Sequence, residues 1–364
     1  MQGQTTERYG KITEQSGESL FKRFIHSIVS GCLTCGCLTV LFFAALLAAG
    51  IYLFSSDSSP VAKCGSIMQN DDSEDFTEKC ISGGCIKENR IAVIDINGII
   101  TSDENASLRS CAVAENICKK LQQAANDKTV KGIIINLNTP GGEVTASDEI
   151  YRKILLVRKN KPVVAMMNSM CASGGYYIAA ACSPIITNKY TLTGSIGVII
   201  STWNYKGLFD KIGVKSEVYT SGKMKDMLNG GRERTAEEEA IVKQLVLNAY
   251  DGFVQVVSSS RKIPAEKIRT TKIGDGRIFD GIQALELKLA DKTGYFEDAV
   301  EACAEEAKLK EYQVFRYEEK FDFGKLFDFL SAEAPAVRLV FPEGASKGNF
   351  EIRKGVLYFL PAGY

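Results

Sequence analysis

Between residues 90 and 200 the sequence alternates short apolar segments with segments of helical periodicity. The apolar segments have the length and the β-branched content of buried strands. They comprise residues 91–96, 132–137, 162–167, 184–187 and 196–200. Apolar residues at helical spacing occupy the intervals 113–125 and 143–157. Because strands that alternate with helices pair mainly in parallel, the sequence predicts an α/β fold.

Upstream of this region, no charged residue occurs between Ser27 and Ser56. The apolar centre of the run is about as long as the 20 or so residues that cross a bilayer as a helix. Lys22 and Arg23 precede it, so the positive-inside rule predicts a cytoplasmic N-terminus. A cleaved signal peptide competes with this interpretation, but the run is long and lacks a clear cleavage site. We therefore expect a single-pass anchor in the cell membrane, with the α/β domain extracytoplasmic.

These features predict a division of the chain into parts. The parts are a cytoplasmic segment (1–26), a transmembrane helix (27–56), a cysteine-containing polar linker (57–89), an α/β domain (90–300) and a C-terminal extension (301–364). Cys64, Cys80 and Cys85 suit an extracytoplasmic disulfide in the linker, whose pairing the sequence leaves open. The apolar stretch 355–364 is expected to dock as a strand or to enter a binding groove.

A serine stands where the third strand-like segment gives way to an alanine-rich, helix-like one. Ser173 is followed there by Gly174 and Gly175. A serine at a strand-to-helix turn lies at the edge of a sheet, beside the unpaired N–H groups of the helix start. The glycines leave room for an approaching carbonyl group. This pattern favours a serine nucleophile with part of an oxyanion hole, although a tight helix–sheet packing turn would use the same residues.

The composition restricts which base could serve such a serine. The chain contains one histidine, His26, which precedes the apolar run. The α/β domain therefore holds no Ser-His-Asp or Cys-His unit, and a histidine-based zinc site is not expected. Lysine is the established alternative base. Basic and acidic side chains are equal in number, 44 each, which argues against a nucleic-acid partner.

Two further loops carry residue types that would complete this chemistry. Gly141 and Gly142 follow the second strand, where consecutive glycines can turn N–H groups into a cleft. The segment S-G-K-M-K-D follows the strand-like residues 216–220 and offers Lys223 and Lys225 as bases. A solvated surface charge is the ordinary explanation for each lysine. Downstream, Thr235 and Glu238 suit a capping box that opens a long helix, and residues 282–288 suit a short one.

Taken together, these motifs resemble the signal peptide peptidase A family of membrane-anchored Ser/Lys proteases. In chain order the motifs are T-P-G-G (139–142), A-S-G-G-Y-Y-I-A (172–179), T-G-S-I-G-V (193–198), S-G-K-M-K-D (221–226) and the segment 275–294. The resemblance covers roughly residues 90–300. The length of the chain is similar to that of the short bacterial form of the family. The resemblance implies a Clp/crotonase-like fold, a core of repeated ββα units wound into a superhelix.

The resemblance also implies catalytic roles. Ser173 matches the nucleophile, and Ser195 matches the hydroxyl that orients the lysine amine. Lys225 matches the general base in preference to Lys223, because the family's lysine directly precedes an aspartate, here Asp226.

The oxyanion hole is implied in the same way. The N–H of Gly174 matches one donor, and the N–H of Gly141 or of Gly142 matches the other. No metal or other cofactor is implied. The expected substrates are remnant signal peptides in the membrane, and the expected assembly is a ring-shaped homo-oligomer.

Three other interpretations remain open at this point. A related membrane protease could act on other membrane-associated proteins. A crotonase-type acyl-CoA enzyme would share the fold and the oxyanion hole, but its chemistry is cytoplasmic and its acidic catalytic pair is not identifiable here. A catalytically silent membrane scaffold would keep the fold without using the serine hydroxyl.

Overall fold

The computed structural model describes residues 76–84, 86–103, 111–319 and 358–359. All of them belong to the unit Gln69–Tyr364 of the chain. The predicted anchor, residues 27–56, lies outside them. No helix within the described residues is both long enough and apolar enough to cross a membrane.

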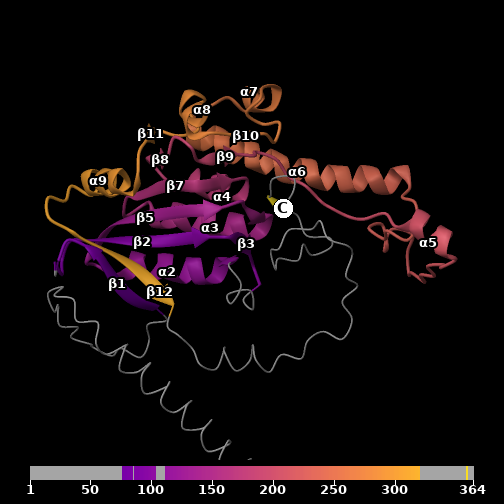
Figure 1. Cartoon of the computed structure of the whole chain (residues 1–364), viewed down its shortest axis with the longest axis horizontal. Helices are drawn as coiled ribbons and strands as arrows, with labels where there is room; N and C mark the ends of the chain where they lie inside the picture. The colour runs from indigo at the N-terminus through magenta and orange to yellow at the C-terminus, as the bar shows by residue number, and fades with distance from the viewer. Residues whose placement is uncertain (1–75, 85, 104–110, 320–357, 360–364) are drawn as a thin grey trace, which may run out of the picture. The chain divides into compact units, whose positions relative to one another are not determined.

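The described residues contain a large mixed sheet that organises the domain (Figure 1). Its strands are β1 (Phe76–Ser82), β2 (Arg90–Asn97), β5 (Val130–Thr139), β7 (Val163–Ala172), β8 (Ile185–Thr187), β9 (Leu192–Gly194), β10 (Ile278–Phe279), β11 (Lys292–Thr293) and β12 (Gln313–Glu319). The order is β1-β12-β2-β5-β7-β8-β11, and β9 pairs with both β7 and β10. The strands from β12 to β11 run parallel, whereas β1 and β10 are antiparallel to their neighbours. The predicted α/β class is therefore confirmed.

A small second sheet lies at the carboxyl ends of the main strands. It contains β3 (Ile99–Thr101), β4 (Cys111–Val113), β6 (Gly142–Glu143) and β13 (Tyr358–Phe359), in the order β13-β6-β3-β4. Strand β13 comes from the C-terminal end of the chain and pairs antiparallel with β6.

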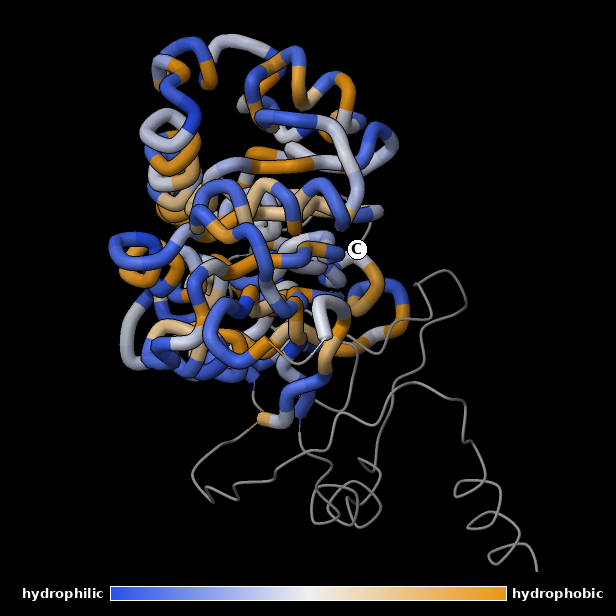
Figure 2. Tube along the Cα trace, turned by 90° about the vertical axis from the view of Figure 1, so that its left-hand side faces the viewer, coloured by the Kyte–Doolittle hydropathy of each residue, from blue (hydrophilic) through white to orange (hydrophobic). Residues whose placement is uncertain are grey.

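Helices cover both faces of the main sheet. The helices are α2 (Ala114–Asn126), α3 (Val144–Val157), α4 (Gly174–Ala179), α5 (Lys206–Ile212), α6 (Ala236–Arg261), α7 (Ala265–Thr270), α8 (Gly281–Glu286) and α9 (Phe296–Glu306). On one face, buried strand residues such as Ile135 share a core with α2, α3 and α4. On the other, residues such as Ile134 pack with α9. Because both faces are covered, consecutive residues in the middle of the central strands are apolar, and hydrophilic and hydrophobic residues alternate along the helices (Figure 2).

The face that packs with α9 changes character at the carboxyl ends of the strands. Its apolar side chains on β2, β5 and β7 give way there to Asp95, Asn136 and Asn168. The Asn136 amide donates to the Asp95 carboxylate at 2.6 Å, and the Asn168 amide donates to the Asn136 carbonyl. A polar chain therefore links three adjacent strands beyond the apolar core.

Most of the expected elements coincide with observed ones. The segments 91–96, 132–137, 162–167 and 184–187 lie on β2, β5, β7 and β8. The two helical intervals are α2 and α3, and residues 282–288 overlap α8. The capping box of Thr235 and Glu238 is present at the start of α6.

Two expected strands are wrong. Residues 196–200 form no strand; the pairing occurs earlier, at β9, and the extended backbone ends where Gly194 and Ser195 adopt φ values of 80° and 49°. Residues 216–220 are irregular, and no strand among the described residues pairs with them.

The structure also places regular elements across the expected boundaries. Strand β1 lies in the predicted linker and pairs with β12. Helix α9 continues past residue 300, and β12, in the expected extension, pairs with β2 inside the main sheet. Among the described cysteines of the linker, Cys80 is an exposed free thiol, while Cys64 and Cys85 lie outside the described residues.

Candidate active site

Ser173 occupies the single residue between β7 and α4. Its backbone has φ 54° and ψ −115°, a conformation that is strained for any residue with a side chain. The surrounding backbone holds it there. The Ser173 N–H donates to the Gly194 carbonyl at 2.8 Å, and the Ser173 carbonyl accepts the N–H of Tyr177 at 2.9 Å. Strain of this kind is typical of a serine presented for chemistry.

The hydroxyl of Ser173 is buried and has no hydrogen-bond partner among the residues that the structure describes. Leaving a buried hydroxyl unsatisfied costs about 1–3 kcal/mol. A packing turn would not need this residue type, because alanine would fill the same space without the unpaired oxygen. A buried serine suits a nucleophile, and no described residue bonds to its hydroxyl as a base would.

Ser195 lies next to Ser173 through strand pairing. The register of β7 and β9 sets Ala172 opposite Gly194, so the residues that follow, Ser173 and Ser195, are neighbours. Ser195 is also buried, has φ 49°, and donates its N–H to the Arg277 carbonyl at 2.8 Å. The structure thus brings the two predicted serines together.

The glycine pair that follows β5 is the third component. Gly141 has φ 106°, and its N–H donates to Thr139 Oγ1 at 3.0 Å. A Cβ on Gly142 would lie 1.9 Å from the Ile100 carbonyl oxygen, so only glycine fits. The Gly141 N–H is bonded within its own loop, whereas Gly142 lies on the edge that β13 occupies, so Gly142 is the one of the two that a peptide bound in place of β13 would meet.

This glycine loop and the serine turn are packed directly together. A Cβ on Gly175, in the first turn of α4, would lie 2.7 Å from Thr139 Cγ2. Gly174 is the first residue of α4, where backbone N–H groups have no partner within the helix. The glycines expected to provide oxyanion donors, Gly141, Gly142 and Gly174, therefore lie on adjoining loops beside Ser173.

The edge of β6 carries a further feature. Glu143 is 2% exposed, and its carboxylate accepts hydrogen bonds from Thr101 Oγ1 at 2.9 Å and from Ser102 Oγ at 2.5 Å. These bonds fix β6 to the end of β3. Along its other edge, β13 sets Phe359 opposite Gly142. An extended backbone therefore lies against the strand that holds the candidate oxyanion donor, the geometry of peptide recognition by strand addition.

Lys225 is the one predicted catalytic residue that the structure keeps apart. It lies in a series of turns between β9 and α6, is exposed, and donates its backbone N–H to the Gly222 carbonyl at 3.0 Å. Within the described part of the chain, no hydrogen bond or ion pair joins it to Ser173 or Ser195. Lys223, the alternative base, forms an ion pair with Glu237 at 2.9 Å.

Helix α6 explains this separation. Near its C-terminal end, Phe253 packs edge-on against Tyr177 of α4, with ring centroids 5.1 Å apart. Glu238, in the first turn of α6, bonds to Arg232 of the loop that carries Lys225. At 1.5 Å of rise per residue, about 22 Å of helix separates the two positions, far beyond the reach of one lysine side chain. Figure 1 shows the segment that contains α5 at the end of α6 remote from the sheet.

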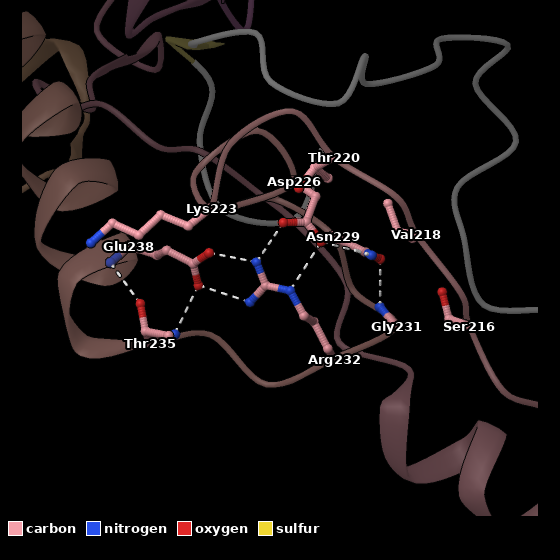
Figure 3. Close-up of a pocket in the computed structure, with 10 residues that line it drawn as sticks. All are labelled: Ser216, Val218, Thr220, Lys223, Asp226, Asn229, Gly231, Arg232, Thr235 and Glu238. Carbon is pink, nitrogen blue, oxygen red and sulfur yellow. Dashed lines mark hydrogen bonds and ion pairs between the residues drawn. The ribbon is translucent and has the colours of Figure 1, made fainter.

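A cluster of charged side chains in the lysine loop escaped the sequence analysis. Arg232 donates from Nε and Nη2 to Asp226 at 3.0 and 2.7 Å, and from Nη1 and Nη2 to Glu238 at 2.9 and 2.5 Å (Figure 3). These bonds hold the pKa of both carboxyl groups at about 2. The usable signal was the spacing of Asp226, Arg232 and the capping-box glutamate.

Two cysteines, Cys171 and Cys182, lie on either side of Ser173 in the sequence. Both are buried, and burial raises the pKa of the Cys182 thiol to about 12 and that of Cys171 well above its usual range. Neither thiol is therefore a competing nucleophile at neutral pH. No group of three or more His, Cys, Asp or Glu side chains within the described ranges is arranged to hold a metal ion.

Comparisons with known proteins identify the family of this chain. Residues 156–310 match the model of peptidase family S49. A protein of Enterococcus faecium with the provisional name signal peptide peptidase SppA is 37% identical over 248 residues, covering 67% of this chain and 71% of that protein. Protease 4 of Salmonella typhi is 32% identical, and the match covers 63% of this chain but only 37% of that longer protein.

One solved structure, a ClpP1 variant from Listeria monocytogenes, matches with 16% identity and a TM-score of 0.39, covering 57% of this chain and 94% of its own. The family assignment rests on the sequence matches, which include most of the length of the E. faecium protein. The S49 match includes the serine motif and the motifs that follow it, whereas T-P-G-G precedes the matched region. The chain therefore belongs to peptidase family S49, the family of the SppA signal peptide peptidases.

Proposed function

We propose that this chain is a serine endopeptidase that uses a Ser/Lys dyad to degrade remnant signal peptides after their release from secretory proteins. The observation that carries the proposal is the buried hydroxyl of Ser173, strained and without a partner, at the junction of β7 and α4. Its surroundings supply the donors for an oxyanion but no base. An acyl-transfer site that lacks only its base suits this arrangement best.

The chemistry follows from the positions of these groups. The neutral amine of Lys225 takes the Ser173 Oγ proton as Oγ attacks the peptide carbonyl carbon. The N–H groups of Gly142 and Gly174 stabilise the resulting oxyanion. The lysine ammonium then protonates the leaving amine, and an ester to Ser173 remains. The amine next takes a proton from water as the water oxygen attacks the ester carbon, and the ammonium returns this proton to Ser173 Oγ as the acid leaves. Ser195, beside Ser173, orients the amine.

In this proposal Lys225 reaches Ser173 from a second copy of the chain in a ring-shaped homo-oligomer. Three properties support this. Lys225 is exposed. It lies in the loop before the start of α6, whereas Ser173 lies beside α4, which packs against α6 near the other end of that helix. The segment before it exposes large apolar side chains, including Trp203 at 84% and Tyr219 at 92%. Such exposed side chains are characteristic of a surface that another protein covers.

The proposed substrates are extended peptides bound along β6. The pairing of β13 with β6 supports this, because a substrate could form the same backbone hydrogen bonds. A membrane anchor at residues 27–56 would hold the domain on the extracytoplasmic side, where signal-peptide remnants remain in the membrane. Family membership supports a Clp/crotonase-like fold for the core. Other membrane-associated proteins are the alternative substrates.

The test is cleavage of a synthetic signal peptide by the full chain in detergent, followed by mass spectrometry. The Ser173→Ala variant is the matched control. Cleavage by the parent and none by the variant would support the proposal. A well-folded parent that cleaves neither this peptide nor a membrane-protein segment would contradict it and would favour a scaffold. Preference for the membrane-protein segment would keep the peptidase and replace the substrate.

A further inference from the structure

The loop that carries Lys225 has little apolar packing to hold it. Among its residues, Ser221, Gly222, Lys223 and Lys225 are exposed. Beside it lies a cavity of about 360 Å³, lined by Ser216, Val218, Thr220, Lys223, Asp226, Asn229, Gly231, Arg232, Thr235 and Glu238 (Figure 3). A loop that borders such a cavity needs another source of order if it is to present an amine accurately.

Arg232 supplies that order through two edges of its guanidinium group. One side of the guanidinium binds the Asp226 carboxylate, and the other binds the Glu238 carboxylate (Figure 3). Asp226 is the residue directly after Lys225. Glu238 in turn accepts the Thr235 N–H at 2.8 Å and thereby caps α6. A planar fork of this kind fixes direction as well as distance, which a single ammonium cannot do.

We propose that Arg232 is a positioning residue for the candidate base: it fastens the Lys225 loop to the first turn of α6 and neutralises the carboxylates beside the lysine. This inference rests on the proposed function of Lys225. It assigns no contact between Arg232 and the substrate.

The charges around the loop give the second half of this role. The charged side chains that bond to one another are Lys223, Asp226 and Arg232 on the loop and Glu237 and Glu238 on α6. Glu233 and Arg234, which also precede α6, bond instead to the side chains of Asn204 and Thr202. Lys223 pairs with Glu237, so the remaining two carboxylates share Arg232. Because Arg232 holds the pKa of Asp226 and Glu238 at about 2, both stay ionised throughout the range in which a peptidase works. Removing the guanidinium would leave two negative charges that favour the protonated amine, the form that cannot act as a base.

A purely structural role predicts a different result. If Arg232 only stabilised the cap of α6, its loss would lower the rate without changing the pH at which the base becomes available. The pH dependence therefore separates the two roles.

The experiment uses the full chain and compares Arg232→Gln, Arg232→Lys and the double variant Asp226→Asn, Arg232→Gln. Arg269→Gln is the control, because Arg269 forms a surface ion pair with Asp251 on α6, at 2.7 Å, outside the lysine loop. For each variant kcat and kcat/KM on a signal peptide are measured against pH. The pH dependence of amine labelling at Lys225 is measured by mass spectrometry in the Ser173→Ala background, where no turnover occurs.

We expect Arg232→Gln to lower kcat about tenfold or more and to raise the midpoint of both pH profiles by up to about one pH unit. The double variant should return the midpoint toward that of the parent while the rate stays low. Arg232→Lys should keep the midpoint and recover only part of kcat, because it restores the charge but not the fork. Arg269→Gln should change neither.

An unmoved labelling midpoint in Arg232→Gln would overturn the inference, even if the rate falls. So would a full recovery of kcat in Arg232→Lys. The labelling result does not depend on turnover, so it distinguishes this failure from a failure of the proposed function. In the latter case the parent would not cleave peptides, whatever the labelling profile of Lys225.

Discussion

The surroundings of Ser173 and the surroundings of Lys225 are built in opposite ways. Ser173 is enclosed by paired strands, by a helix start and by glycines that fit only as glycines. The segment around Lys225 is connected mainly by turns and surface ion pairs, and its helix α5 buries no residue. The fold therefore encloses the candidate nucleophile and the candidate oxyanion donors, whereas it exposes the candidate base.

This difference indicates how activity could be restricted. If Lys225 is the base for Ser173, one chain alone should be inert, because about 22 Å of α6 separates the contact of Phe253 with Tyr177 from Glu238 beside the lysine loop. In the proposed mechanism the hydroxyl of Ser173 meets its base only when copies assemble, so catalysis and assembly become one event. The predictions below test each side of this contrast.

The largest effect should come from separating the two residues onto different chains. Ser173→Ala and Lys225→Ala should each lose about 10³-fold or more in kcat. Mixing and reassembling equal amounts of the two inactive variants should restore about a quarter of the parent activity, because a heterologous ring then contains some intact sites. Peptide cleavage before and after mixing measures this. No recovery in a mixed assembly would place the base within the same chain, and Lys223→Ala should remain active throughout.

A methyl group on the enclosed side of the site should have the next largest effect. Gly142→Ala puts a Cβ 1.9 Å from the Ile100 carbonyl oxygen, so β6 must move and its N–H with it. Loss of one oxyanion donor typically lowers kcat by about 10²- to 10³-fold. Gly252→Ala, where no atom lies within 4 Å of the new Cβ, is the matched control and should leave kcat unchanged. A fully active Gly142→Ala variant would remove Gly142 from the oxyanion hole.

A smaller effect is expected from freeing the edge of β6. Deleting residues 357–364 removes β13, which covers this edge in the structure. A tethered strand competes with substrate at a high effective concentration, so its removal should raise kcat/KM severalfold, about two- to tenfold. Steady-state kinetics on a short peptide would measure the change. An unchanged value would make β13 a structural strand, and a fall would make it part of the substrate site.

The smallest effect should come from the thiols beside the nucleophile. Because burial raises the pKa of Cys182 to about 12 and that of Cys171 well above its usual range, both remain protonated at pH 8 and become reactive only at a much higher pH. Iodoacetamide at pH 8 should therefore modify the exposed Cys80 and leave both buried thiols and the activity intact. Peptide mass spectrometry would detect the modification. Inactivation that follows alkylation of Cys171 would contradict this view of the site.

Much of the core was predictable because its strands are long, apolar and covered on both faces. The strands β2, β5, β7 and β8 were predicted from their apolar residues, and the serine turn was predicted from its place after β7. The strand expected at residues 196–200 failed for a physical reason. Its apolar residues resemble a strand, but Gly194 and Ser195 in left-handed conformations end the extended backbone before it begins.

The sequence could not reveal how the site is divided in space. The motifs assign Ser173 and Lys225 to one catalytic site but carry no information about the distance between them. The helix that separates them, α6, follows both residues in the sequence. Strand β12 was missed because its partner, β2, lies more than two hundred residues earlier, and pairing of that kind leaves no local pattern. The role of Arg232 depended on Asp226 and Glu238 meeting across a turn.

The polar chain of Asp95, Asn136 and Asn168 has a consequence for how the nucleophile finds its place during folding. Uniformly apolar parallel strands tolerate a slip of two residues, since the same kinds of side chain then face the same layers. A slip of β7 by that amount would break the Asn168–Asn136 bond and would carry Ser173 away from the Gly194 carbonyl. The hydrogen bonds of these amides thus form only in the strand register that brings Ser173 to its position. Accuracy of strand alignment, more than added stability, is what these residues give the enzyme.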